Sequence, residues 1–447
     1  MTDHLVAVRS RDEVLTDRDN PGGPPFTAVV ADGAHLPAGF LPAIEGVLRE
    51  AGGDTCVYGD FRVAGQRIAV GEWSVERSRW QHWTGPVMVV PTHMLCEVAD
   101  PLIDPPRLSG DVRYLPKVLS EIDADDLRDL TTAERSRFTA HLPFTIGGTA
   151  TRPRRESGLQ PSRSIVIPTR GSGGRLAGRE VRWLDECLSS LGTVLDDPGV
   201  DVVLVLDDDV DPGFTAPWRE RLGGRLGILA TPGPFNFPTK VNAGVAQSRG
   251  EIVALLNDDV VALTPDWLDR MAVVATEPEV GAVGAVLVYE DGAVQHRGHV
   301  FAGGEVHLLD RGGDTGDAGP RGRNLCDRDV SGVTGACLVQ RREVWDRMGG
   351  FDPALPVAFN DVDYTERLRS AGLRVVLCNS VRLHHFESKT RPGHATPDEW
   401  ELIHTRWASS FGRPDPFTPL AEPPPARGRV GLRQRMRTWW TSGPHRP

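Results

Sequence analysis

Short apolar runs that stop abruptly at polar residues are the feature that most constrains the fold of the C-terminal two-thirds of this chain. Four such runs have the length and composition of buried strands: SIVIP (164–168), VVLVL (202–206), LGILA (226–230) and EIVALL (251–256). Leucines between 184 and 195 recur at helical spacing between the first two runs. Strands alternating with helices predict an α/β fold with a mostly parallel sheet and helices on both faces.

The polar residues that end these runs mark the expected site. In open α/β sheets, ligands bind beyond the carboxyl ends of the strands, and those ends lie along one edge of a parallel sheet. We therefore expect one site where three polar clusters meet: Thr169-Arg170, Asp207-Asp208-Asp209 and Asn257-Asp258-Asp259.

Charge and cysteine content exclude some functions and locations. The formal net charge of the 447 residues is −11, whereas nucleic-acid binders usually carry a basic excess, so we expect no nucleic-acid partner. None of the six cysteines forms a CxxC pair, and their apolar surroundings predict buried free thiols in a reducing compartment. We see no signal peptide and no apolar stretch of membrane-spanning length, so we expect a cytoplasmic protein.

The chain divides into four predicted parts. Residues 1–147 are expected to form a small α/β module, because TAVVADG (27–33) and DTCVYGD (54–60) have the pattern of strands that end in turns. Residues 148–163 are rich in Gly, Pro, Ser and Arg and predict a linker. Residues 164–420 form the main α/β domain. The tail, 421–447, combines Arg and Trp and predicts either contact with anionic headgroups at the inner face of the membrane or a solvated segment.

The carboxylates of LLNDDV (255–260) are the strongest chemical signal. Two carboxylates directly after a buried strand repel each other, and a divalent cation such as Mn²⁺ or Mg²⁺ relieves that repulsion. A solvated turn is the alternative interpretation.

A second acidic pair lies in FNDVDYTERLRSAG (359–372), where a helix is expected to begin. The dipole at a helix N-terminus stabilises an ionised carboxylate, so Asp361 or Asp363 could act as general base towards a hydroxyl. Plain helix capping is the alternative.

Basic and imidazole side chains complete the candidate set. His384 and His385 follow the strand-like RVVLC (374–378), and one of them could ligate a metal through a neutral ring nitrogen. Arg391 could meet phosphate charge or face water. Asp207 could accept a hydrogen bond from a nucleobase, and Lys240 and Asn242 could face a diphosphate or ribose, or only shape a turn.

These segments, taken in order, are similar to glycosyltransferase family 2. The similarity covers nearly all of residues 164–391. The matching segments are SIVIPTRG (164–171), VLVLDDD (203–209), 235–260, 281–298, 332–352, 360–372 and HHFESKTR (384–391). Within the family, the chain most resembles bacterial O-antigen and rhamnosyl-type transferases of cell-surface polysaccharide synthesis. The resemblance implies a GT-A fold, a Rossmann-like α/β architecture, and an inverting single displacement.

The resemblance also implies roles for particular residues. Asp361 is the expected base, with Asp363 as alternate, and Asp259 and His385 are the expected ligands of Mn²⁺ or Mg²⁺. The expected donor-binding residues are Pro168, Thr169, Arg170, Asp207, Lys240, Asn242, Asn257, Asp258 and Arg391. Gly335, Ala336 and Cys337 are expected to shape the sugar and acceptor pocket.

Two positions depart from the family pattern. Asn257 stands at the start of the DxD element, and Asn360 replaces the Glu of the Glu-Asp element, which leaves the choice between Asp361 and Asp363 open. The N-terminal module resembles the back half of a degenerate transferase domain and lacks a complete set of motifs, so we expect no catalysis from it.

The implied reaction moves a sugar from a nucleoside-diphosphate sugar, with uridine or thymidine as base, to a hydroxyl of a glycan or lipid-linked acceptor. The donor sugar, the linkage and the oligomeric state stay open. Two alternatives remain: a non-catalytic sugar-binding or scaffold protein on a transferase fold, and a sugar nucleotidyltransferase. The latter class normally carries a Gly-rich basic loop after its first strand, and Arg170–Arg175 resembles one only faintly.

Overall fold

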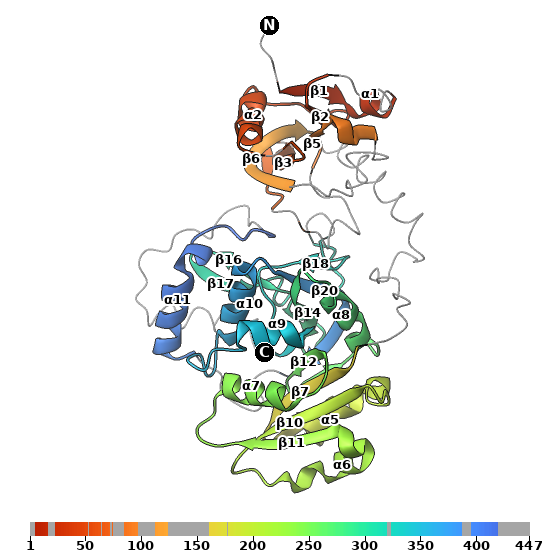
Figure 1. Cartoon of the computed structure of the whole chain (residues 1–447), viewed down its shortest axis with the longest axis vertical. Coiled ribbons are helices and arrows are strands. Elements are labelled where there is room, and N and C mark those ends of the chain that lie inside the picture. The colour runs from red at the N-terminus through yellow and green to blue at the C-terminus, as the bar shows by residue number, and fades with distance from the viewer. Residues whose placement is uncertain are drawn as a thin grey trace. The chain divides into compact units, whose positions relative to one another are not determined.

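The computed structural model shows two compact units, whose main parts are residues 1–150 and 151–413 (Figure 1). The residues that it describes are 5–16, 23–51, 53–63, 65–71, 74, 85–96, 112–123, 161–176, 178–319, 323–386 and 395–418. Most of the predicted linker and the whole of the predicted tail lie outside these ranges. Within them, no helix is long and apolar enough to cross a membrane.

A mixed sheet with strand order β1-β2-β5-β3-β4 forms the core of the first unit, and β6 pairs with β3. Its elements are β1 (Val6–Ser10), α1 (Arg11–Thr16), β2 (Phe26–Val30), α2 (Phe40–Glu50), β3 (Cys56–Val63), β4 (Gln66–Ile68), β5 (Val87–Pro91), a 3₁₀ turn (Thr92–Cys96) and β6 (Val112–Ile122). The strands expected at 27–33 and 54–60 correspond to β2 and β3. Helix α2 buries Phe40, Ile44 and Leu48 against the sheet, which is the spacing of one helical face.

The second unit is built on a ten-stranded sheet with strand order β11-β10-β7-β12-β19-β14-β20-β13, in which β15 and β18 pair with β14 and β20. Its strands are β7 (Arg163–Thr169), β10 (Val200–Asp207), β11 (Leu226–Thr231), β12 (Ile252–Leu256), β13 (Val260–Ala262), β14 (Val280–Val288), β15 (Val294–His296), β18 (Arg328–Asp329), β19 (Cys337–Arg341) and β20 (Arg374–His385). The first four strands in this order are parallel, as predicted, and β19 runs antiparallel to both of its neighbours.

Helices cover both faces of this sheet. They are α5 (Trp183–Ser190), α6 (Ala216–Leu222), α7 (Phe237–Gln247), α8 (Trp267–Ala275), α9 (Arg342–Met348) and α10 (Asn360–Ser370). The last helix, α11 (Pro397–Phe411), packs instead against α10 and against Phe301 and Val306. Ile165 and Ile167 of β7 pack with α5, α6 and α8, whereas Val166 packs with α7, α9 and α10. Because successive strand residues point to opposite faces, the continuous apolar run at 164–168 serves both layers.

Two hairpins lie outside the large sheet: β8 (Gly173–Leu176) with β9 (Arg179–Arg182), and β16 (His299–Ala302) with β17 (Glu305–Leu308). The cysteines that the structure describes at side-chain level are free and buried, as predicted; they are Cys56, Cys187, Cys326, Cys337 and Cys378. Burial and the neighbouring Asp258 and Asp259 carboxylates raise the pKa of the Cys187 thiol well above its ordinary value, so this thiol stays protonated.

The strand ends meet along one edge of the sheet. β7, β10 and β12 are parallel and finish there, and β19 begins there because Cys337 pairs with Leu256. The polar residues after each strand are therefore brought together at this edge, as the sequence pattern predicts.

Candidate active site

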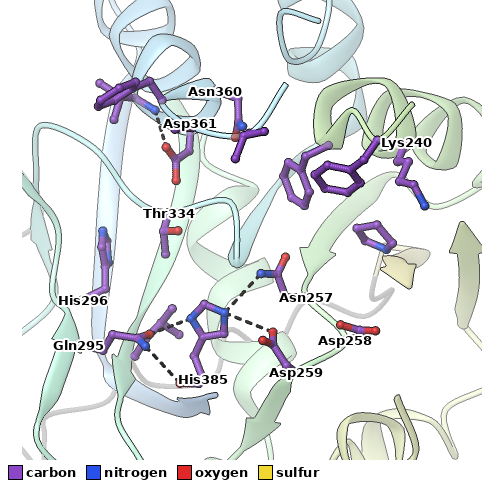
Figure 2. Close-up of a pocket in the computed structure, with 18 of the residues that line it drawn as sticks. Lys240, Asn257, Asp258, Asp259, Gln295, His296, Thr334, Asn360, Asp361 and His385 are labelled. Carbon is purple, nitrogen blue, oxygen red and sulfur yellow. Dashed lines mark hydrogen bonds and ion pairs between the residues drawn. The ribbon is translucent and has the colours of Figure 1, made fainter. Parts of the chain in front are cut away.

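A cavity of about 350 Å³ lies at the carboxyl ends of β7 and β12 (Figure 2). Nine of the predicted site residues line it: Pro168, Thr169, Arg170, Lys240, Asn257, Asp258, Asp259, Asp361 and His385. These residues come from five separate segments of the chain. Their convergence is a property of the sheet order rather than of any single motif.

The turn after β12 contributes two buried carboxylates. Asp258 and Asp259 are 8% and 5% exposed. The Thr169 hydroxyl donates to Asp258 Oδ2 at 2.6 Å, and the Asn257 backbone N–H donates to the Ala336 carbonyl at 3.0 Å. Strand β7 and the start of β19 thus hold the turn from both sides, and its carboxylates face the cavity.

His385 reaches the same turn from the end of β20. The short strand β13 pairs antiparallel with β20, with Val260 opposite His385, and this register sets the imidazole beside Asp259. His385 Nε2 lies 3.3 Å from Asp259 Oδ1 and 3.3 Å from Asn257 Nδ2, and Nδ1 lies 2.8 Å from Gln295 Oε1 (Figure 2). His384 is elsewhere, with Nδ1 3.1 Å from the Tyr289 carbonyl.

Asp259 and His385 fit a divalent cation of the Mn²⁺ or Mg²⁺ type. A carboxylate and a neutral imidazole are both ligands that Mn²⁺ accepts, and here they face each other across 3.3 Å. In the described part of the chain, no group of three or more His, Cys, Asp or Glu side chains is arranged to hold a metal. The protein would thus supply two ligands and leave the other positions to phosphate oxygens and water.

Asp361 lies in the first turn of α10, and both of its carboxylate oxygens are held by backbone donors. The Gly335 N–H donates to Oδ2 at 3.0 Å and the Val362 N–H donates to Oδ1 at 2.8 Å. The residue just before the helix, Phe359, has φ of 59°, a conformation that non-glycine residues rarely adopt. The chain is therefore sharply turned where it enters α10, and the carboxylate of Asp361 faces the cavity.

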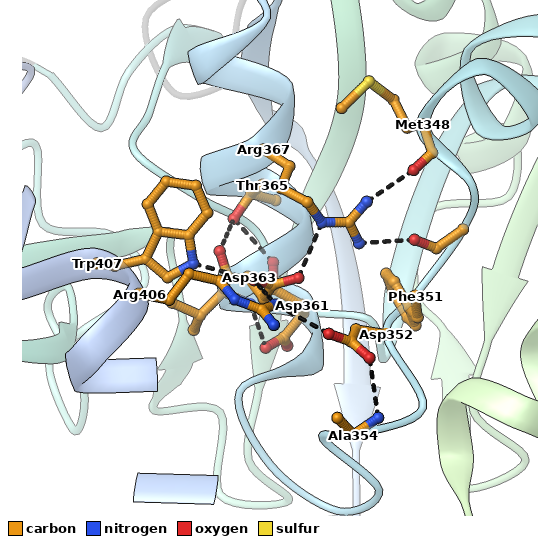
Figure 3. A network of polar contacts seen from close by, with 12 residues as sticks. Met348, Phe351, Asp352, Ala354, Asp361, Asp363, Thr365, Arg367, Arg406 and Trp407 are labelled. Atoms are coloured by element: carbon orange, nitrogen blue, oxygen red, sulfur yellow. Dashed lines mark hydrogen bonds and ion pairs between the residues drawn. The ribbon is translucent and has the colours of Figure 1, made fainter. Parts of the chain in front are cut away.

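Asp363 does not line the cavity. Its side chain is fully buried and accepts hydrogen bonds from Arg367 Nε at 2.9 Å, Arg406 NH1 at 2.7 Å and Trp407 Nε1 at 3.0 Å (Figure 3). Arg406 and Trp407 belong to α11, so Asp363 joins α10 to α11. Residues two apart on a helix point in different directions, which separates the two carboxylates.

An ion pair joins Lys240, which lines the cavity, to Asp207 at the end of β10, which does not. Lys240 Nζ is hydrogen-bonded to Asp207 Oδ1, and Arg170 Nε lies 3.8 Å from Asp207 Oδ2. Lys240 is only 3% exposed. The Asn236 side chain caps α7 by accepting from the Thr239 N–H, and this helix start carries Lys240 towards the strand end.

Other predicted site residues lie outside the cavity. The Asn242 side chain exchanges two hydrogen bonds with the Phe351 backbone, at 2.9 and 3.0 Å, and so connects α7 to the loop after α9. Cys337 is buried in the core. Gly335 and Ala336 act through their backbones, on Asp361 and Asn257, and neither lines the cavity. Arg391 lies outside the described residues.

Four further polar residues line the cavity that sequence reasoning did not single out: Gln295, His296, His299 and Thr334. Burial lowers the pKa of His296 well below its ordinary value, and the nearby His299, His385 and Arg328 lower it further. Burial also lowers the pKa of His299, although the Asp361 carboxylate opposes this effect. Both imidazoles are therefore neutral near neutral pH. The QHRGH segment (295–299) was a detectable signal, because polar side chains there interrupt an apolar pattern.

The sheet and the cavity at its carboxyl edge define a Rossmann-like α/β protein. Residues 177–410, more than half of the 447-residue chain, match the family described as "Glycosyltransferase like family 2". The chain belongs to glycosyltransferase family 2. This membership confirms the predicted family and, together with the observed sheet, the predicted GT-A fold.

Two of three similar curated proteins carry names from the predicted subgroup. The uncharacterized protein y4gI of Sinorhizobium fredii is 42% identical over 220 residues, which are 46% of this chain and 24% of that protein. The O-antigen biosynthesis protein RfbC of Myxococcus xanthus is 37% identical over 226 residues, 48% of this chain and 18% of that protein. An N-acetylglucosaminyl-diphospho-decaprenol L-rhamnosyltransferase of Mycobacterium tuberculosis is 29% identical over 46% of this chain and 73% of its own length. The chain thus matches a quarter or less of the length of the first two relatives.

Solved structures of similar outline include GalNAc-T7 with UDP, GalNAc and Mn²⁺, at 11% identity and a TM-score of 0.43, over 57% of this chain and 51% of that one. The mannosyltransferase PcManGT from Pyrobaculum calidifontis, in complex with GDP-Man and Mn²⁺, is 16% identical with a TM-score of 0.39, over 66% of this chain and 73% of that one.

Proposed function

We propose that the chain is an inverting, metal-dependent glycosyltransferase that moves a sugar from a nucleoside-diphosphate sugar to a hydroxyl of a glycan or lipid-linked acceptor. One observation carries the proposal: the carboxylates of Asp259 and Asp361 and the imidazole of His385 line one cavity, although 126 residues separate the first from the last. Membership in a glycosyltransferase family favours this reaction over the nucleotidyltransferase and scaffold alternatives.

The donor would lie along the β7–β12 side of the cavity. Thr169 holds Asp258, and the Lys240–Asp207 pair offers both a carboxylate for a nucleobase N–H and a cation near phosphate. Asp259 and His385 would hold the cation, which, when bound, acts as a Lewis acid that offsets charge on the departing diphosphate. Residues 164–420 would carry the whole reaction, and residues 1–147 would contribute no catalytic group.

Asp361 is the proposed general base. Backbone N–H groups of Gly335 and Val362 hold its carboxylate at the cavity wall, and neither Arg nor Lys lies among the hydrogen-bond partners described for it. A fixed carboxylate can accept the proton of an acceptor hydroxyl as the oxygen attacks the anomeric carbon. Asp363 is unsuited to this role because its oxygens already accept from Arg367, Arg406 and Trp407.

The test is the substitution Asp361→Asn, measured with purified full-length chain, a panel of UDP- and dTDP-sugars and Mn²⁺. Turnover should fall by about two to four orders of magnitude, because the base is lost. The Asn side chain has nearly the same size but can accept from only one of the two backbone N–H groups of Gly335 and Val362. Donor binding should be nearly unchanged. Asp346→Asn, on the exposed side of α9, is the matched control and should transfer sugar normally.

Three results would contradict the proposal. Wild-type turnover by Asp361→Asn would show that Asp361 is not the general base. Undiminished turnover in excess chelator would show that the reaction needs no divalent cation. Release of pyrophosphate rather than nucleoside diphosphate would indicate nucleotidyl transfer.

A further inference from the structure

Gln295 makes two hydrogen bonds to the same residue, His385. Its Oε1 lies 2.8 Å from His385 Nδ1, and its Nε2 donates to the His385 backbone carbonyl at 3.1 Å (Figure 2). The two residues are 90 positions apart in the chain. Gln295 is 3% exposed and lies on β15, which pairs with β14, and β14 pairs in turn with β20. The strand order therefore holds the amide against both the side chain and the backbone of His385.

These two bonds decide which ring nitrogen of His385 carries the proton. The amide nitrogen of Gln295 must donate to the carbonyl, because a carbonyl oxygen can only accept. The amide oxygen is then left facing Nδ1, so Nδ1 must carry a hydrogen and donate it. A neutral ring has only one N–H, so Nε2 keeps its lone pair.

A second contact agrees with this assignment. Asn257 Nδ2 lies 3.3 Å from His385 Nε2, and an amide nitrogen is a donor, which suits an Nε2 that accepts. The same Nε2 lies 3.3 Å from Asp259 Oδ1. Two electron-pair donors at that separation repel each other unless a positive charge lies between them. The single lone pair of Nε2 that accepts from Asn257 is the one that a cation beside Asp259 would take in place of that hydrogen bond.

We propose that Gln295 is the positioning residue for His385: it fixes the Nδ1–H tautomer and the ring orientation, so that Nε2 and Asp259 form a ready pair of metal ligands. This inference rests on the proposed metal role of His385. Polar groups that orient a ligating histidine typically change metal affinity by about 10–100-fold when they are removed. In this proposal Gln295 acts through His385, which makes it a positioning residue rather than a catalytic one.

The first experiment needs no metal and no activity. Selective ¹⁵N-histidine labelling of the metal-free full-length chain at about pH 8 keeps the imidazoles neutral, and the His385 signals are assigned by their loss in His385→Ala. We expect a single tautomer with Nδ1 protonated, and a mixture of tautomers in Gln295→Leu. A protonated Nε2 in the wild type, or an unchanged tautomer in Gln295→Leu, would overturn the inference.

The second experiment measures Mn²⁺ affinity by electron paramagnetic resonance, with UDP present at saturation. Gln295→Leu should weaken binding about 10–100-fold, and His385→Ala should weaken it at least as much. Gln340→Leu is the matched control, because Gln340 is also fully buried and accepts from the Tyr364 hydroxyl at 2.9 Å, away from the cavity. It should leave Mn²⁺ affinity unchanged even if it lowers stability.

Together, the two experiments distinguish failure of the positioning role of Gln295 from failure of the proposed metal site. If His385→Ala weakens Mn²⁺ binding and Gln295→Leu does not, the positioning role fails and the metal site stands. If His385→Ala binds Mn²⁺ as tightly as the wild type, the proposed metal site itself fails, whatever tautomer the imidazole adopts.

Discussion

At the scale of single residues, Asp361 and Asp363 show how two carboxylates in one helical turn can differ completely in surroundings. Asp361 is held by backbone N–H groups at the cavity wall. Asp363 is buried and accepts from two guanidinium groups and an indole (Figure 3). The Asp363 carboxylate raises the pKa of Arg406, and the pair connects α10 with α11. The proposed catalytic residue and the residue that connects two helices are thus only two positions apart.

We expect Asp363→Asn to lower the free energy of unfolding by roughly 1–3 kcal/mol, the range for hydrogen bonds to charged groups, because Arg367 and Arg406 lose their shared anion. Asp361→Asn should lower the free energy of unfolding by less, because only one backbone hydrogen bond to the side chain is lost. Chemical denaturation of both variants measures the difference. If Asp363→Asn were as stable as the wild type and Asp361→Asn were not, the two roles would have to be exchanged.

Some of the residues around the cavity could be predicted from the sequence, and others could not. Asp258, Asp259 and Asp361 follow an apolar strand or open a helix, so local pattern was sufficient to single them out. The choice between Asp361 and Asp363 stayed open because it depends on Arg406 and Trp407, some forty positions away. Gln295 was missed for the same reason: its function arises from strand pairing, and nothing next to it in the sequence indicates a partner at His385.

At the scale of elements, α11 acts as a support for the cavity wall. Thr396 and Glu399 form a capping box at its start, in which the Thr396 N–H donates to Glu399 Oε2. The other oxygen, Oε1, accepts from the backbone N–H groups of Val357 and Ala358, at 2.7 and 2.8 Å. Val357 and Ala358 line the cavity. One buried side chain therefore links the helix start to the loop that precedes Asp361.

Glu399→Gln tests this link. The amide nitrogen of Gln would have to face an N–H donor, either at Thr396 or at the loop, so one set of hydrogen bonds is lost. We expect KM for the acceptor to rise several-fold, with a smaller change in kcat. Glu401→Gln, on an exposed part of the same helix, is the control. Steady-state kinetics with varied acceptor concentration gives KM and kcat for both variants. Equal KM values for Glu399→Gln and Glu401→Gln would show that the Glu399 hydrogen bonds do not affect acceptor binding.

The strands of the parallel half of the sheet were predictable almost to the residue, because β7, β10, β11 and β12 are apolar runs bounded by polar residues. The antiparallel direction of β19, and its position in the sheet, could not be predicted from the sequence. Its short sequence, Cys337–Arg341, has no feature that gives a direction, and its place between β12 and β14 follows from pairing across distant segments.

At the scale of the whole molecule, the neutral histidines beside the cavity couple stability to pH. Burial lowers the pKa values of His296 and His299 in the folded state, while an unfolded histidine titrates near 6.5. Below about pH 6.5 the unfolded chain therefore binds more protons than the folded one, and acid favours unfolding. The stability is fully present above that pH and is lost as the pH falls towards the folded-state values.

We expect the free energy of unfolding to decrease between about pH 7 and pH 5, by at most about 1.4 kcal/mol per pH unit for each histidine. His296→Gln should show a shallower decrease than the wild type. His93→Gln, which alters an exposed histidine, should not. Denaturant titrations at several pH values provide the measurement. Parallel curves for wild type and His296→Gln would mean that folding does not lower the pKa of His296.

Strand β20 has a consequence for how this protein can diverge. Its pairing with β14 shifts register between Cys378 and Arg382, but from Val381 to His385 its residues alternate between the two faces of the sheet, and Val260 lies opposite His385. Inserting or deleting one residue between Arg382 and His385 would move the next side chain into register with Val260 and turn the His385 ring to the other face. Active relatives are therefore expected to keep the number of residues between Arg382 and His385, because that short stretch alone sets which ring meets Asp259.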